Sequence, residues 1–155
     1  MIKKIFYLLA FTFFTSSCGF KIVEDTKFKN FDIVSIETIG DNRINYILEN
    51  SLKDNLSSSE KKIKLNLITK RIKEIKERNI RNEITKYSIT IQTKINYFLE
   101  NSDKEGKFEV SKSGNFNLAN QYSQSITNEK KLIEYLSLQI QKEIINNLNI
   151  ILNDI

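Results

Sequence analysis

The chain has 155 residues and a net charge of +5, contains no histidine, and has Cys18 as its single cysteine. One cysteine excludes an internal disulfide, and a chain without histidine can build neither a His/Cys metal site nor a catalytic triad. Carboxylate or lysine chemistry remains open to it, but no paired motif indicates such chemistry. The length suffices for one domain with a hydrophobic core and not for two. We therefore expect one non-enzymatic domain, with no catalytic residues, no cofactor and no metal.

The first 17 residues have the pattern of a secretory signal peptide. Lys3 and Lys4 form a positive start, and an apolar run follows at 5–14. Ten helical residues rise only about 15 Å, half of a hydrocarbon core of about 30 Å, so this run is too short to span a membrane. We therefore expect residues 1–17 to be removed on export.

Small residues lead directly into the cysteine, in the sequence Thr-Ser-Ser-Cys-Gly at 15–19. This segment resembles a bacterial lipobox, in which the cysteine is acylated and becomes the first residue after cleavage. The resemblance implies palmitate on Cys18 and a lipidated tether over 18–30. The alternative is an ordinary signal peptide that happens to contain a cysteine.

The first expected strand covers 31–39, where β-branched residues on both faces predict burial on much of both. A turn at 40–42 follows, in which Asp41 or Asn42 can cap a helix. The helix is expected over 41–56, because apolar residues recur every four positions from Ile44 to Leu56.

Two long strands come next. In the first, apolar residues alternate over 63–67, the phase changes at Ile68 and resumes at Ile72, and this predicts a β-bulge or strong twist near Ile68. The second, over 86–99, has a strict period of two, so one face is expected to be buried and the other wet. Its expected dry face consists of Tyr87, Ile89, Ile91, Thr93, Ile95, Tyr97 and Leu99.

A polar turn at 101–106 precedes a fourth strand, which is expected from Phe108 to Leu118. Asn128 is expected to cap a long closing helix whose apolar stripe runs from Leu132 to Leu152. The element order β-α-β-β-β-α predicts a two-layer α+β sandwich, a four-stranded mainly antiparallel sheet with two helices on one face. This single domain is expected over 31–155.

The order and several short segments resemble the family of LPS-assembly lipoproteins known as LptE. The resemblance covers nearly the whole chain after the signal peptide, and it depends on element order and apolar spacing. It implies an outer-membrane lipoprotein of a Gram-negative bacterium that plugs an LptD-like β-barrel, assists its assembly and helps insert lipopolysaccharide into the outer leaflet. The segments are Cys-Gly-Phe at 18–20, Ile-Val-Ser-Ile at 33–36, Leu-Glu-Asn-Ser-Leu at 48–52, Lys-Leu-Asn-Leu at 64–67 and Thr-Lys-Tyr-Ser-Ile-Thr at 85–90.

Positive charge is concentrated between Lys61 and Lys86, where ten basic and three acidic residues give a net +7. Arginine binds phosphate bidentately and lysine binds it as a point charge, so the hairpin predicts a site for lipopolysaccharide phosphates. The alternative is a solvated hairpin whose lysines discourage edge pairing. The candidate binding residues are Lys70, Arg71, Lys73, Lys76, Arg78, Arg81 and Lys86.

Two functions of different kinds remain open at this point. The first is the LptE-like role, lipid-anchored on the periplasmic side of the outer membrane. The second is a periplasmic accessory lipoprotein of another envelope or transporter complex. Nucleic acid is not expected as a partner, because export separates the protein from it and the aromatic residues lie on the expected dry face.

Overall fold

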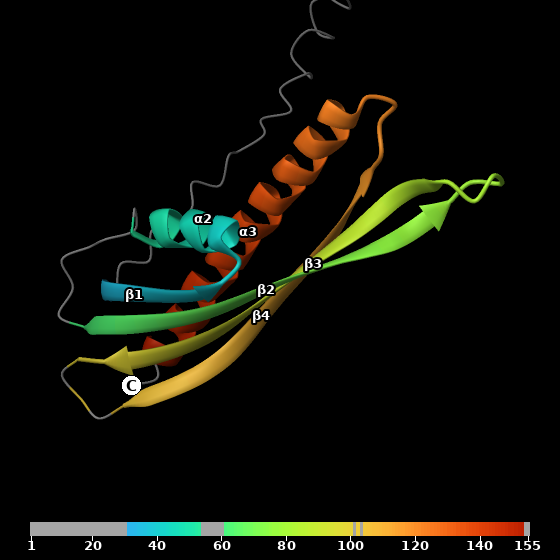
Figure 1. The fold of residues 1–155 in the computed structure, drawn as a ribbon. Helices are drawn as coiled ribbons and strands as arrows, with labels where there is room; N and C mark the ends of the chain where they lie inside the picture. The colour runs from blue at the N-terminus through green and yellow to red at the C-terminus, as the bar shows by residue number, and fades with distance from the viewer. Residues whose placement is uncertain (1–30, 54–60, 101, 103, 154–155) are drawn as a thin grey trace, which may run out of the picture.

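The computed structural model describes residues 31–53, 61–100, 102 and 104–153. Within them, four strands and two helices follow one another in the predicted order β-α-β-β-β-α, and the predicted α+β class is confirmed. Figure 1 shows the two helices on one side of the sheet. The elements are β1 (Asp32–Gly40), α2 (Asn42–Lys53), β2 (Lys62–Arg78), β3 (Ile84–Leu99), β4 (Glu105–Asn117) and α3 (Tyr122–Asn153).

The strands lie in the order β1-β2-β3-β4, with β1 parallel to β2 and the other two pairs antiparallel. A parallel pair requires a crossover connection, and α2 lies in this one. β1 pairs with β2 only as far as Thr69. The outer part of the β2–β3 hairpin therefore extends past β1 and away from the helices, as Figure 1 shows.

The expectation that the first strand is buried on both faces is wrong. The register of β1 against β2 shifts between Ile33 and Ser35, so Val34 is an extra, bulged residue. The bulge places Ile36 on the same side as Ile33, toward the helices. Because both helices lie on that side, Val34 and Ile39 are exposed.

The bulge expected near Ile68 is absent from the described strand β2. Its pairing with β3 runs without a shift from Ile63 to Ile75, and the irregularities lie further on, between Ile75 and Arg78. The apparent change of phase arises because the inward side of β2 becomes polar at Thr69 while Ile68 lies on the outer face. The sequence pattern therefore looked like a change in register, although only the polarity of the two faces of β2 changes along the strand.

The core forms where the helical stripes meet the dry face of the sheet. The predicted dry face of β3 is confirmed, since its central residues Ile89 to Tyr97 are buried and Tyr87 and Leu99 pack against the core. On the helices, the buried apolar residues are Ile44, Leu48, Leu52, Ile133, Leu136, Ile140, Ile144, Leu148 and Leu152. Among the described residues, no helix is both long and apolar enough to cross a membrane.

The predicted cap of the first helix is confirmed at Asp41. Its Oδ1 accepts hydrogen bonds from the backbone N–H groups of Arg43 (3.1 Å) and Ile44 (3.2 Å), which the first turn of a helix leaves without backbone partners. The described helix ends at Lys53, and the expected extension to Leu56 lies outside the described residues.

The predicted start of the last helix at Asn128 is wrong, because α3 begins six residues earlier, at Tyr122. Asn128 lies inside the helix, and its amide donates to the backbone oxygen of Asn117 at 3.4 Å. The first turns are held by polar contacts: the buried Ser125 hydroxyl accepts from the backbone N–H of Ala119 at 2.9 Å. Apolar spacing could not reveal a helix start that is built from polar groups.

Gly40 joins β1 to α2 and has a φ of 115°, a conformation that L side chains rarely adopt. A Cβ at this position would lie 1.9 Å from the backbone oxygen of Thr69. Glycine therefore allows Asp41 to approach β2, where its backbone N–H donates to the Thr69 hydroxyl at 3.1 Å. This close approach brings the helix cap next to the hairpin.

Candidate binding surface of the hairpin

The seven candidate basic residues all lie on the β2–β3 hairpin, but they occupy three different environments. Arg71 and Lys73 lie on the side that faces the helices. Arg78 and Arg81 lie at the hairpin turn, and Lys86 is paired across the strands near it. Lys70 and Lys76 are exposed on β2.

Arg71 and Lys73 take the inward positions of β2 beyond the end of the apolar core, and two carboxylates lie against them. Arg71 Nε lies 3.0 Å from Asp41 Oδ2, and its Nη1 lies 3.9 Å from Glu129 Oε1. Lys73 Nζ lies 2.6 Å from Glu129 Oε2. The four groups form a neutral cluster that connects the start of α2, the middle of β2 and α3.

Two aromatic rings adjoin this cluster. Tyr87 and Phe116 are stacked with their centroids 5.8 Å apart. Lys73 Nζ lies 4.5 Å from the centroid of Tyr87 and 5.3 Å from that of Phe116, within the range of cation–π attraction. Lys73 is thus held by one carboxylate and two aromatic faces.

Buried polar groups position the Asp41 end of the cluster. The Thr69 hydroxyl, 4% exposed, lies 2.5 Å from the Asn45 Oδ1 on α2 and accepts the backbone N–H of Asp41. Asp41 therefore uses its N–H to hold β2, Oδ1 to cap α2 and Oδ2 to pair with Arg71. Its position is determined before any ligand arrives.

The hairpin turn is ordered by the side chain of Asn79. The Asn79 Oδ1 accepts the backbone N–H groups of Arg81 and Glu83, both at 2.9 Å, and Arg78 Nη1 donates to the Asn82 backbone oxygen at 2.8 Å. Asn82 has a φ of 61°, which asparagine tolerates better than most residues. The turn presents the fully exposed side chain of Ile80 beside Arg81.

Lys86 pairs with Glu77 across the strands at 2.7 Å. Lys70, Lys76 and Arg81 are exposed and make no ion pair within the part of the chain that the structure describes. Arg78 also makes no ion pair among the described residues, so these four cations are available to bind an external anion.

The net charge of +7 between Lys61 and Lys86 is spread along the whole of β2. Lys61, Lys62 and Lys64 lie where the strand begins, and its 17 residues at about 3.3 Å each place them about 55 Å from the turn. The outer segment 74–86 holds four basic and three acidic residues, a net +1. What distinguishes the turn is therefore not its net charge but the close spacing, within six positions, of Lys76, Arg78 and Arg81, three exposed cations that make no ion pair among the described residues.

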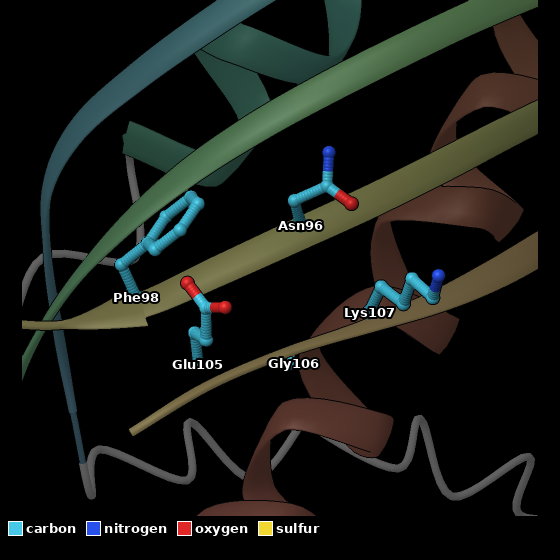
Figure 2. Close-up of a pocket in the computed structure, with 5 residues that line it drawn as sticks. All are labelled: Asn96, Phe98, Glu105, Gly106 and Lys107. Carbon is cyan, nitrogen blue, oxygen red and sulfur yellow. The ribbon is translucent and has the colours of Figure 1, made fainter. Parts of the chain in front are cut away.

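A shallow hollow of about 270 Å³ lies elsewhere, on the open face of the sheet, between β3 and β4. Figure 2 shows Asn96 and Phe98 on β3 beside Glu105 and Lys107 on β4, with Gly106 between the latter two. The sequence interpretation did not select these residues. One feature of the sequence could have indicated this site. In the alternating pattern of the strand, Phe98 follows the inward Tyr97 and is therefore an aromatic residue on the face that is expected to be wet.

Within the described ranges, no group of three or more His, Cys, Asp or Glu side chains is placed to hold a metal ion. Cys18 and the expected signal peptide and tether lie outside these ranges.

Neither a protein-family model nor a curated protein matches the sequence. Solved structures do match the fold. Rare lipoprotein B of Shewanella oneidensis has a TM-score of 0.55 at 9% identity, over 74% of this chain and 92% of that one. The chain has the fold of rare lipoprotein B.

Two further structures extend this likeness. A protein of Caulobacter crescentus CB15 described as a lipoprotein has a TM-score of 0.57 at 18% identity, over 76% of this chain and 90% of that one. Lipoprotein B of Nitrosomonas europaea has a TM-score of 0.52 at 14% identity, over 84% and 88%. At such identities the rare lipoprotein B fold is shared, but individual residue roles do not transfer from these proteins.

Proposed function

We propose that this chain is an outer-membrane lipoprotein of the LptE kind, lipid-anchored on the periplasmic side through Cys18. In this role it plugs an LptD-like β-barrel, assists the assembly of that barrel and helps insert lipopolysaccharide into the outer leaflet. The observation that carries the proposal is a rare lipoprotein B fold that begins about a dozen residues after a lipobox-like segment at 15–19.

The arrangement of the sheet suits such a role. Asp32, where the chain enters the domain, pairs with Lys62 at the start of β2, whereas the turn of the hairpin lies about 55 Å away at the other end. A domain tethered at its entry can therefore extend the hairpin well away from its anchor. The acyl chains supply the membrane attachment, so the hairpin remains available for contacts.

The open face of the sheet also suits the inside of a barrel, which in outer-membrane proteins is polar. Its central residues on β3 and β4 are mostly uncharged and polar, including Gln92 and Ser111, and the hydroxyls of Thr90 and Ser113 lie 2.7 Å apart. Such a face can exchange hydrogen bonds with a hydrated wall without burying unpaired charges.

The candidate partner for the free cations at the hairpin turn is the phosphate of lipopolysaccharide. Replacing Lys76, Arg78 and Arg81 together with glutamine is expected to weaken binding to lipopolysaccharide about tenfold, because each exposed ion pair contributes roughly 0.2–1 kcal/mol. The matched control replaces Lys62, Lys94 and Lys130, three exposed lysines outside the turn, with glutamine. Binding is measured by titration with detergent-dispersed lipopolysaccharide, and an equal loss in both variants would exclude a specific role for the turn.

The partner itself is tested by affinity purification of the full-length chain from its native envelope, followed by mass spectrometry. Recovery of a large outer-membrane β-barrel supports the proposal. Recovery of an inner-membrane transporter without a barrel would instead support the accessory lipoprotein of another envelope complex.

A further inference from the structure

Glu129 occupies a position in which an anionic ligand could bind. Its two carboxylate oxygens reach toward two cations of β2: Oε2 lies 2.6 Å from Lys73 Nζ and Oε1 lies 3.9 Å from Arg71 Nη1. We propose that Arg71 and Lys73 form an anion-binding pair that Glu129 masks, and that a phosphate of an amphiphilic ligand displaces this carboxylate. The inference rests on the proposed function and adds to it a gate that controls access to these two cations.

Arg71 is prepared for such a ligand by the contacts on its other side. Its Nε pairs with Asp41 Oδ2 at 3.0 Å, and Asp41 is itself held by the α2 cap and by Thr69. This arrangement directs an Nη group of Arg71 toward Glu129, on the same side as Lys73. A phosphate in place of the carboxylate offers three oxygens where Glu129 offers two, so one group can pair with both Arg71 and Lys73.

Displacement of Glu129 requires little free energy. The side chains of Arg71, Lys73 and Glu129 are 37%, 38% and 23% exposed, and ion pairs of this kind contribute at most a small stabilisation because water screens them. A phosphate with a larger charge can therefore compete with the single carboxylate. The released Glu129 remains at the surface, where water solvates it.

The surroundings of the two cations favour a ligand with an apolar part. The stacked rings of Tyr87 and Phe116 lie directly under Lys73. Ile75 follows on the same side of β2, opposite Tyr87 in the register, and its side chain is 47% exposed. Cations beside partly exposed apolar groups match a phosphorylated lipid better than a free anion.

The test compares Glu129→Gln with Glu134→Gln, which removes the same charge from an exposed position on the same helix. The full-length protein is titrated with detergent-dispersed lipid A and, separately, with inorganic phosphate. E129Q is expected to bind lipid A about two- to fivefold more tightly than the unmodified chain, because the competing carboxylate is gone. E134Q is expected to bind as the unmodified chain does, and adding Lys73→Gln to E129Q should abolish the gain.

The inference is overturned if E129Q gains no more affinity than E134Q, or if the gain survives the loss of the Lys73 charge. A gain for inorganic phosphate without any binding of lipid A would support the masked pair and count against the lipid-handling function, so the two failures are distinguishable. Circular dichroism of each variant establishes that the fold is retained. Should E129Q unfold, Lys73→Gln alone is compared with Lys130→Gln, and equal binding of lipid A by these two variants would overturn the inference.

Discussion

Replacing Leu67 with alanine is expected to lower the free energy of unfolding by about 2–5 kcal/mol, the range for a leucine removed from a packed core. Replacing its neighbour Ile68 with alanine is expected to cost about 1 kcal/mol or less. The two residues are adjacent on β2 and similar in volume. Leu67 is 0% exposed and packs under the helices, whereas Ile68 is 39% exposed on the open face.

Urea denaturation of the purified chain, followed by circular dichroism, measures both effects. Each variant removes a similar volume of apolar side chain from the same strand. The higher β-propensity of isoleucine would raise the cost of the Ile68 change, so it cannot produce the expected difference. Equal losses of stability would contradict the unshifted register of β2, since a slip of one residue exchanges the two faces.

Replacing Cys18 with serine is expected to abolish the incorporation of labelled palmitate and to release the protein from the membrane fraction. Several acyl chains on one residue bind almost irreversibly, since each buried methylene contributes about 0.8 kcal/mol. Serine has nearly the same size but offers no thiol for acylation.

The matched control for this variant is Ser17→Ala, which keeps a small residue before the cleavage position and retains the thiol. This control is expected to be labelled and to sediment with membranes as the unmodified chain does. Label in the Cys18→Ser protein, or its unchanged retention in the membrane fraction, would refute the lipid anchor and with it the basis of the proposed function.

The inward side of β2 changes character along its length, and this change links the fold to the proposed site. It is apolar at Ile63, Leu65 and Leu67, polar at Thr69, and positive at Arg71 and Lys73. The core therefore ends where the cluster with Asp41 and Glu129 begins. Beyond it, the hairpin has no cover from the helices, so its side chains are free to contact a partner.

Local patterns in the sequence determined the elements with the strongest periodicity. The alternation of β3 specified its dry face, and the four-residue spacing specified the buried stripes of both helices. Asp41 and Asn42 before an apolar stripe indicated a cap, and the structure uses Asp41. In each case the cause lies within a few residues, because strand and helix periods are properties of the local backbone. The positively charged segment was visible in the same way.

Tertiary structure decided what depends on residues distant in the chain. Lys73 meets Glu129, 56 positions away, and Asp41 meets Arg71 through the turn at Gly40. These contacts, rather than charge alone, separate the paired cations of the candidate site from the free ones at the turn. Three further features depend on which elements pack against each other: the single buried face of β1, its parallel pairing with β2 and the early start of α3. A local sequence pattern does not show which other elements will cover a segment, so these features could not be predicted from it.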